Sequence, residues 1–359
     1  MLQAVLKTDI LYEQLLEELS KYSPGDQFMT NREIMKRFNV SQLVVDQTVA
    51  RFREAGLLRV VPGRGTFTTD RVRRFHSDAP ATYLFAVPRW NSTNLTLMDG
   101  YINSLREKYS PKRILIHRFN YEDLIPQNLP IMEENVKGVA LQVSSSTPWN
   151  SQTLKMLEQY MAEVPLVVLN RHHGDISVMT VGADDIFAGN LAASHLYHYG
   201  HRKIAVLISE PYGSVIEERV RGVLNYVRQH DMECVVLNSA VRSGEYAPDK
   251  TYRYFLGEIH KGFDFTGMIG ISSDSFTGAV NACLNSGIRI PEELSLVTIG
   301  HHQTAEIQHP PLDCVDLNME GQIDAVLELL ENPGKFTPNT NPYDYFTPSM
   351  IVNGSVINR

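Results

Sequence analysis

The sequence predicts an α/β protein in which a small, mainly helical N-terminal module precedes a larger module of parallel sheets flanked by helices. The 359 residues suffice for two or three domains, each with its own core. The first 70 residues show helical apolar spacing and end in a glycine-rich hairpin pattern. From Tyr83 onward, short apolar runs alternate with helical stretches, which is typical of parallel sheets covered on both faces.

Charge is distributed unevenly along the chain. Residues 28–75 contain ten Lys or Arg and four Asp or Glu, a net charge of +6, whereas the whole chain carries −8 and the remainder therefore −14. A basic block on an acidic protein indicates a small anion-binding module attached to a body with another role. A solvated charged face would have the same composition.

The cysteines and the N-terminus indicate a cytoplasmic protein. Cys234, Cys283 and Cys314 are far apart, odd in number and without metal-ligand spacing, so we expect reduced core residues. The sequence has no secretory signal pattern and no apolar run of about 18 residues, which argues against secretion and membrane insertion.

Two helices are expected before residue 40. Thr30 and Glu33 match a capping box, in which each side chain accepts a backbone N–H of the other residue. The short helix that follows places Ile34 and Phe38 inward. An earlier helix stops at the turn signal Ser23-Pro24-Gly25, and its helically spaced apolar residues are Ile10, Leu11, Leu15, Leu16 and Leu19.

A third helix is expected to begin after Ser41, whose hydroxyl can cap it, and to end at Gly56. Its apolar stripe is Val45, Val49 and Phe52. The opposite face is left for solvent or for a partner, and it carries Gln42, Asp46, Gln47 and Arg53.

A hairpin of residues 57–61 and 65–67 follows, and glycine permits a positive φ at its tip, Pro62-Gly63-Arg64. With the helices it resembles the GntR-type winged helix-turn-helix through Pro24-Gly25-Asp26, Arg32-Glu33, Val40-Ser41, Gly56-Leu57-Leu58 and Gly63-Arg64-Gly65-Thr66-Phe67. The resemblance implies a third helix in the major groove, a wing in the minor groove and a second-helix arginine on phosphate. The implied DNA-binding residues are Arg32, Ser41, Gln42, Leu43, Asp46, Gln47, Arg53, Gly63, Arg64 and Gly65.

The third helix departs from the family pattern. The family usually has arginine just after the serine and again four residues later, whereas this chain has Gln42 and Asp46. Glutamine can read adenine, but a carboxylate accepts only from the cytosine amino group and is repelled by phosphates. We therefore expect DNA binding with an unusual site preference that depends more on Arg32, Arg53 and Arg64. A degenerate module that no longer recognises DNA is the alternative.

Domain boundaries follow from these patterns. The winged helix-turn-helix is expected at residues 1–69, a linker without apolar periodicity at 70–81, and the large module at 82–359. Ligands in such sheets bind outside the carboxyl ends of the strands. The strands are expected at 83–87, 114–119, 138–143, 165–169, 204–208, 235–237, 268–271 and 294–299, with helices that include 95–108, 151–162, 187–199, 217–230 and 276–286.

The large module resembles the LacI/GalR-type effector core, which is akin to periplasmic sugar-binding proteins. The similarity covers nearly all of residues 82–359 and implies two α/β lobes, an interlobe ligand cleft, a homodimer, and crossovers near residues 182, 315 and 340. It rests on Gly182-Ala183-Asp184-Asp185, Gly189, Ala193, His195-Leu196, residues 200–205 and 164–171, Arg219 with Gly222, Ser273-Asp274 with Gly278, Gly287 with Pro291, and Pro310-Pro311-Leu312.

Effector-binding positions carry over from this family one at a time. Arg219 matches an arginine that bonds sugar hydroxyls, and a guanidinium fork suits vicinal oxygens. Asn170, beside Arg171, replaces a usual aspartate. Asp274 keeps its place, while Ser273 replaces an asparagine.

Other effector positions differ from the family or are open to two interpretations. The usual Gly-aromatic-Asp-Asp step is missing, so a standard hexose or pentose contact is in doubt; His301 or His302 stands there, although loop histidines often face solvent. Trp90 and Trp149 follow the first and third strands, where an indole can stack on a sugar ring or pack in a core.

No pattern points to catalysis or to a cofactor. His172-His173 and His301-His302 are pairs of adjacent residues, which rarely direct both rings at one metal ion. The sequence has no nucleophile elbow, phosphate loop or dinucleotide fingerprint. We expect no metal, no cofactor and no enzymatic activity.

The expected function is transcription regulation. A cytoplasmic homodimeric repressor would bind a pseudo-palindromic operator in double-stranded DNA and respond to a small polar effector, for which a sugar is the first candidate. Two alternatives stay open: a ligand-binding protein with a degenerate DNA-binding module, and a cytosolic sugar-active enzyme.

Overall fold

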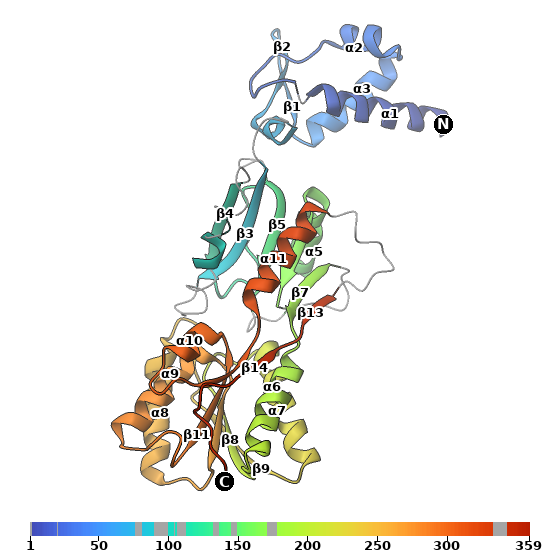
Figure 1. Cartoon of the computed structure of the whole chain (residues 1–359). Coiled ribbons are helices and arrows are strands. Elements are labelled where there is room, and N and C mark those ends of the chain that lie inside the picture. The colour runs from blue at the N-terminus through green and yellow to red at the C-terminus, as the bar shows by residue number, and fades with distance from the viewer. Residues whose placement is uncertain are drawn as a thin grey trace. The chain divides into compact units, whose positions relative to one another are not determined.

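The computed structural model describes residues 2–19, 21–75, 81–89, 100–103, 105, 113–131, 136–144, 149–170, 178–332 and 343–359 (Figure 1). The chain divides into two compact units. The first holds residues 1–83, 109–115 and 128–138, and the second holds residues 84–108, 116–127 and 139–359.

The N-terminal module consists of three helices and a two-stranded hairpin, as the sequence predicts. In the hairpin, Leu58 pairs with Thr68 and Val61 with Gly65 in antiparallel register. Gly63 and Gly65 at its tip have φ of 72° and 116°, which confirms the expected positive φ. The elements are α1 (Leu2–Leu19), α2 (Asn31–Phe38), α3 (Gln42–Glu54), β1 (Leu58–Val61) and β2 (Gly65–Thr68).

One apolar core joins the helices of this module. Leu11 and Leu15 of α1 pack with Phe52 of α3, and all three are fully buried. The Tyr12 ring stacks on Phe52 with centroids 4.6 Å apart. Of the helically spaced apolar residues of α1, Ile10 is 52% exposed, whereas the stripe that includes Leu11 and Leu15 is buried.

The two predicted helix caps behave differently. Thr30 and Glu33 form the complete capping box: the Glu33 N–H donates to Thr30 Oγ1 and the Thr30 N–H donates to Glu33 Oε2. Ser41 occupies the N-cap position of α3 with an extended backbone, but its hydroxyl accepts no capping bond. The prediction for Ser41 is therefore correct in position and wrong in its hydrogen bond.

The first part of the segment expected to be a linker is helical. A 3₁₀ helix, η1 (Asp70–Phe75), follows β2, and Val72 is fully buried in the N-terminal core. Arg71 donates from a guanidinium nitrogen to the Ala55 carbonyl at 2.9 Å. Residues 70–75 therefore pack on the module and do not form a free tether; residues 76–80 lie outside the described residues.

The first lobe contains a six-stranded sheet in the order β13-β7-β6-β5-β3-β4 (Figure 1). Helix α11 (Met319–Glu331) packs on β6 and β7, and α5 (Ser151–Glu163) begins with a capping box at Asn150. The strands are β3 (Thr82–Arg89), β4 (Arg113–Asn120), β5 (Val136–Gln142), β6 (Leu166–Leu169), β7 (Met179–Ala183) and β13 (Tyr343–Phe346).

The second lobe contains a six-stranded sheet in the order β14-β12-β11-β10-β8-β9. Its strands are β8 (Lys203–Ile208), β9 (Glu233–Asn238), β10 (Gly267–Gly270), β11 (Ser295–Gly300), β12 (Asp313–Asp316) and β14 (Ser349–Ile351). Its helices are α6 (Asp185–His198), α7 (Ser214–Gln229), α8 (Ala247–Lys261), α9 (Ser273–Asn285) and the short α10 (His302–Glu306). The β14 strand runs antiparallel to β12, while β8, β9, β10, β11 and β12 pair in parallel.

Alternate residues of β8 enter two separate cores, as expected for a strand buried on both faces. Ile204 and Val206 pack with side chains of α6 and α7, whereas Ala205 and Leu207 pack with side chains of α8 and α9. The chain passes between the two sheets three times: after β7, after β12, and between β13 and β14. The α/β class with two parallel-sheet lobes is thus confirmed.

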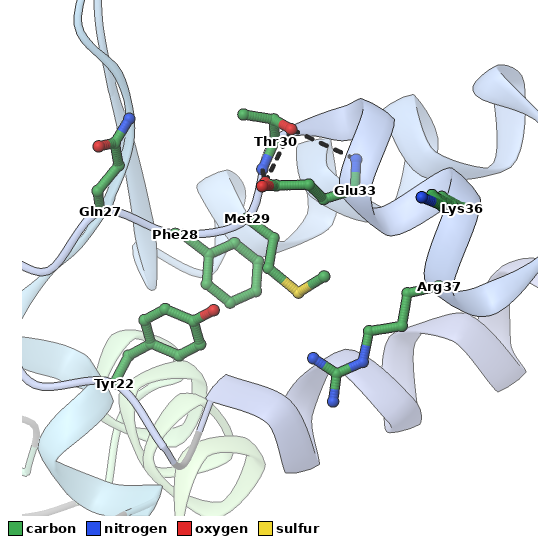
Figure 2. A pocket seen from close by; sticks show the side chains of 8 residues that line it. All are labelled: Tyr22, Gln27, Phe28, Met29, Thr30, Glu33, Lys36 and Arg37. Carbon is green, nitrogen blue, oxygen red and sulfur yellow. Dashed lines mark hydrogen bonds between the residues drawn. The ribbon is translucent and has the colours of Figure 1, made fainter.

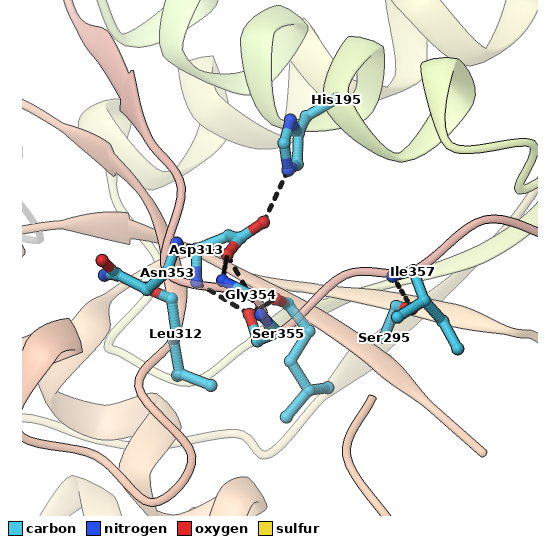
Figure 3. A network of polar contacts seen from close by, with 9 residues as sticks. His195, Ser295, Leu312, Asp313, Asn353, Gly354, Ser355 and Ile357 are labelled. Atoms are coloured by element: carbon cyan, nitrogen blue, oxygen red, sulfur yellow. Dashed lines mark hydrogen bonds and ion pairs between the residues drawn. The ribbon is translucent and has the colours of Figure 1, made fainter. Parts of the chain in front are cut away.

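A buried carboxylate fixes the C-terminal segment to the second lobe (Figure 3). Asp313 Oδ2 lies 2.7 Å from His195 Nε2, and Oδ1 accepts the backbone N–H groups of Asn353, Gly354 and Ser355. Burial alone would raise the pKa of Asp313, but these bonds outweigh it and hold the pKa below its usual range.

Candidate DNA-binding face and ligand site

The residues predicted to touch DNA lie on the surface of the N-terminal module. Arg32 on α2, Arg53 in the last turn of α3 and Arg64 on the wing are all exposed. Ser41, Gln42, Leu43, Asp46 and Gln47 are exposed along the start of α3, and the Leu43 side chain is 62% exposed. Contact with a thymine methyl group or with a deoxyribose would require an exposed apolar side chain of this kind among polar ones.

The wing is held close to the loop before α2. Gln27 Nε2 donates to the Arg64 carbonyl at 3.2 Å, and a Cβ placed on Gly65 would lie 2.8 Å from that amide nitrogen. Gly63 has open space around it. The wing is therefore held at Gly65 by Gln27, whereas the turn at Gly63, which is followed by Arg64, is not enclosed by neighbouring atoms.

The carboxylate of Asp46 on α3 accepts two side-chain hydrogen bonds, one of them from the neighbouring helix. Its Oδ1 accepts from Asn31 Nδ2 at 2.8 Å and from Gln42 Nε2 at 3.4 Å. Asn31 is the first residue of α2, so the bond links the two helices of the helix-turn-helix.

A groove of about 710 Å³ lies beside this face in the same module (Figure 2). The rings of Tyr22 and Phe28 lie in it edge to face, 5.0 Å apart. Arg37 at its border donates to Glu18 at 2.7 Å. The lining residues are Tyr22, Gln27, Phe28, Met29, Thr30, Glu33, Lys36 and Arg37, none of which is among the predicted DNA contacts.

In the second lobe, two glycines set the position of Arg219. A Cβ on Gly189 of α6 would lie 2.0 Å from the Arg219 carbonyl oxygen, and a Cβ on Gly222 of α7 would lie 2.1 Å from the Ile186 carbonyl oxygen. Only glycine at both positions allows α6 and α7 to approach this closely. The packing brings Arg219 beside the first turn of α6.

Arg219 is held there by two hydrogen bonds. Its Nε donates to Asp185 Oδ1 at 2.7 Å and its Nη1 donates to the Ile271 carbonyl at 2.8 Å, with the two charged side chains 11% and 7% exposed. Burial raises the pKa of Asp185, although the arginine opposes the shift. The guanidinium plane is therefore fixed at the carboxyl end of β10, and among the described residues Nη2 donates no hydrogen bond.

Further polar side chains occupy the same edge of the sheet. Glu210 lies two residues after the end of β8, and its carboxylate accepts a hydrogen bond from the hydroxyl of Ser272, one residue before α9. Burial raises the pKa of Glu210, while Ser272 and Arg219 lower it. Asp274 in the first turn of α9 is 6% exposed and interacts electrostatically with Glu210.

The two adjacent histidines have different surroundings. His301 is 9% exposed, its backbone N–H donates to Ser273 Oγ at 3.1 Å, and burial lowers its pKa to about 4. His302 is more open, and its Nδ1 lies 3.1 Å from Asp316 Oδ1. A cavity of about 40 Å³ adjoins them, lined by His301, His302, Gln303, Asp316, Asn318, Met319 and Glu320.

Four of the predicted effector residues thus gather at one edge of the second-lobe sheet: Arg219, Ser273, Asp274 and His301. With their neighbours Asp185, Glu210, Ser272 and Asp316 they form what we call the strand-end cluster. Trp149 precedes α5 and is partly buried. Asn170 follows β6, is exposed, and has a φ of 65°. Both belong to the first lobe. Trp90 and Arg171 lie outside the described residues.

Sequence reasoning missed Asp185, Glu210, Ser272 and Asp316. Glu210 carried a usable signal, since it stands at the end of an expected strand, where ligands of parallel sheets bind. Asp185 was part of a recognised motif but had no assigned role, because its pairing with Arg219 across 34 positions is a tertiary contact.

The described residues contain no group of three His, Cys, Asp or Glu side chains arranged to hold a metal ion. Cys234, Cys283 and Cys314 are free thiols, and burial raises the pKa of Cys234 to about 11. Within the same described ranges, no helix combines the length and the apolar character needed to cross a membrane.

Comparisons with known proteins agree with this architecture. Residues 193–340 match the periplasmic binding protein-like domain family. The arabinose metabolism transcriptional repressor of Geobacillus stearothermophilus is 23% identical over 301 residues, which cover 81% of this chain and 82% of the relative. The repressor of the same name from Halalkalibacterium halodurans is 20% identical over 308 residues and covers 81% and 80%.

Solved structures show the fold of the large module. A LacI family transcriptional regulator from Enterococcus faecium with bound ribose superposes with a TM-score of 0.63 at 16% identity, over 77% of this chain and 99% of that one. A periplasmic binding protein/LacI transcriptional regulator from Alkaliphilus metalliredigens, complexed with D-xylulofuranose, reaches 0.61 at 17% identity with the same coverage. The named relatives are transcriptional regulators and not enzymes.

Proposed function

We propose that this chain, in which a winged helix-turn-helix precedes a two-lobed periplasmic binding protein-like domain, is a DNA-binding transcription regulator controlled by a small sugar. The observation that carries the proposal is the presence, in one chain, of an exposed arginine-bearing wing and helix face and of the strand-end cluster. Relatives that align with most of the chain are named as arabinose metabolism repressors. The proposed domains are residues 1–75, which include η1 packed on the winged module, and 82–359.

The strand-end cluster favours a ligand rich in hydroxyl groups. Arg219 supplies N–H donors whose direction is fixed by Asp185 and by the Ile271 carbonyl. Asp274 and Glu210 supply carboxyl oxygens at neighbouring strand ends. A sugar offers both donors and acceptors on adjacent carbons, and relatives of this fold hold ribose or D-xylulofuranose. Trp149, Asn170, Ser273, His301 and His302 complete the proposed site, with Trp90 and Arg171 from the sequence.

Regulation follows if the sugar binds two states of the protein with different affinity. A cytoplasmic homodimer would place two wings and two third helices on the half-sites of a pseudo-palindromic operator. Sugar binding would shift the dimer between spacings of the two modules that do and do not fit DNA. The protein then acts as a repressor whose affinity for DNA depends on the sugar.

Selection of bound fragments from genomic DNA tests the first half of the proposal. A shared motif is expected, with affinity that falls steeply as salt rises, because arginines displace counterions from phosphates. Arg64→Ala should weaken binding about tenfold, with Arg253→Ala, an exposed arginine of α8, as the control. Recovery of fragments without a common motif, or binding that is indifferent to salt, would contradict sequence-specific recognition.

Thermal unfolding with a panel of sugars tests the second half. A sugar at about 100 times its Kd should raise Tm by roughly 5 °C. Arg219→Ala should abolish the shift when compared with its own ligand-free Tm, whereas Arg221→Ala, an exposed residue of the same helix, should keep it. Absence of any shift with wild-type protein would remove the sugar assignment, and turnover of a sugar would replace it with an enzymatic one.

A further inference from the structure

The carboxylate of Asp46 on the third helix has an arrangement that its sequence position does not reveal. It accepts hydrogen bonds from two amides, Asn31 Nδ2 at 2.8 Å and Gln42 Nε2 at 3.4 Å. Gln42 and Asp46 lie four positions apart on one face of α3, and Asn31 reaches them from the start of α2. Asp46 and Gln42 are both exposed on α3.

The chemistry of the carboxylate determines how both amides are turned. An ionised carboxylate only accepts hydrogen bonds, so each amide must present its NH₂ group to Asp46 and direct its carbonyl oxygen elsewhere. Within the described residues, no hydrogen bond engages Gln42 Oε1. The Gln42 amide therefore has a free acceptor oxygen and one free N–H, side by side in a plane.

We propose that Asp46 is a positioning residue that orients the Gln42 amide to read adenine in the major groove. In this arrangement Gln42 Oε1 accepts from adenine N6 and the remaining Nε2 N–H donates to N7, the bidentate pairing that glutamine makes with adenine. Guanine presents an acceptor at the N6 position and is rejected. The inference rests on the proposed DNA-binding function and specifies one base within its operator.

The interaction becomes stronger when DNA is bound than it is in solvent. Free in water, Gln42 exchanges between Asp46 and solvent at little cost. Docking in the groove removes water, and a hydrogen bond to a charged acceptor gains strength as the local dielectric falls. Asn31 holds the carboxylate from the other helix at 2.8 Å, which limits its movement toward the phosphates.

The test compares duplexes that differ at one base pair. The operator is first obtained by selection with full-length wild-type protein, and the position whose preference disappears in Gln42→Ala is identified. Wild-type protein should prefer adenine over guanine there by about tenfold or more. Asp46→Asn should reduce the preference to about threefold or less at that same position, because asparagine can turn its own NH₂ group toward Gln42.

A double variant separates orientation from direct readout. If Asp46 acts through Gln42, Asp46→Asn has no added effect in the Gln42→Ala background. If Asp46 instead contacts a cytosine, Asp46→Asn changes the preference at a different base pair and the proposal is overturned. Retention of the full adenine preference by Asp46→Asn overturns it as well. A failure of wild-type protein to select any motif would count against DNA binding itself, and so is distinguishable.

An exchange of the two partners provides a rescue. In the double variant Asn31→Asp with Asp46→Asn, the carboxylate stands at position 31 and the amide at position 46. The carboxylate accepts a hydrogen bond from the NH₂ group of that amide, whose carbonyl oxygen is then turned toward Gln42 Nε2. The adenine preference should return to within about threefold of wild type. Asn31→Asp alone places two carboxylates together and removes the amide that holds Asp46, so it should lower the adenine preference.

Discussion

The N-terminal DNA-binding face and the strand-end cluster both contain charged residues, but they are organised in opposite ways. Arg32, Arg53 and Arg64 are exposed, and their side chains are directed to solvent. Arg219 and Asp185 are almost fully buried and bonded to each other. Exposed cations recognise a polyanion at long range and with salt dependence, whereas a buried, pre-bonded network recognises a small ligand by direct replacement of water. We therefore expect substitutions on the N-terminal face to impair DNA binding, and substitutions in the strand-end cluster to impair stability and ligand binding.

The largest expected effect is on stability in the second lobe. Asp185→Ala leaves the Arg219 guanidinium buried without its carboxylate partner, and the free energy of unfolding should fall by about 3–5 kcal/mol. Asp249→Ala removes one partner of an exposed pair with Arg253 and should cost about 0.5 kcal/mol or less. Chemical denaturation of both variants measures the difference; equal losses would show that the buried pair has no special role.

The dependence of stability on pH should be the next largest effect. His201 is fully buried, its Nδ1 lies 2.7 Å from Thr266 Oγ1, and burial lowers its pKa to about 4. Because the unfolded chain takes up the proton first, near its usual pKa of about 6.5, this stabilisation is complete above that pH and is lost as pH falls toward 4. The loss between pH 7 and 5 is about 2 kcal/mol.

The variant His201→Gln isolates this contribution. The raised pKa values of Asp185 and Glu210 act in the opposite direction, since a carboxyl with a raised pKa gains stability as pH falls. The difference in slope between wild type and His201→Gln therefore measures His201 alone. His260→Gln, at an exposed position of α8, is the matched control. Parallel pH profiles for all three proteins would be inconsistent with a buried neutral histidine.

The sequence predicts features that depend on local patterns and does not predict features that depend on contacts between distant residues. The periodic stripes of α3 and β8 and the capping box at Thr30 are local patterns, and the structure confirms them. The strands β7, β12, β13 and β14 have three to five residues each, beside the points where the chain changes sheets, and were not predicted. These segments mix polar with apolar residues and lack the continuous apolar run that marks the equally short β6 and β10.

Candidate site residues divide along the same line. Arg64 and Gln42 were found because a motif fixes their place, and their exposure needs no partner to be known. Glu210 was missed because its role depends on the Ser272 hydroxyl and on its closeness to Asp274, both distant in sequence. The Asp46 contact with Asn31 was missed for the same reason, although the unusual carboxylate itself was recognised.

A smaller effect should separate two arginines of the second helix. Arg32 is exposed and is expected on phosphate, whereas the Arg37 guanidinium is engaged by Glu18 at 2.7 Å. Arg32→Ala should lower operator affinity about tenfold and reduce the slope of log K against log salt by about 1. Arg37→Ala should change either quantity by less than about threefold. Salt titrations of operator binding measure both; similar losses would mean that the ion pair with Glu18 opens on DNA.

The smallest expected effect concerns the two helix caps of the N-terminal module. Thr30 completes a capping box, so Thr30→Ala should destabilise the module by about 1 kcal/mol. Ser41 makes no capping bond with its hydroxyl, so Ser41→Ala should cost only a few tenths of a kcal/mol. Because that hydroxyl is exposed at the start of α3, it is free to donate to a phosphate, and Ser41→Ala should instead weaken DNA binding. Denaturation of the two variants beside operator titration separates the roles: a Ser41→Ala protein that loses stability and keeps its affinity would assign Ser41 to the fold and not to the interface.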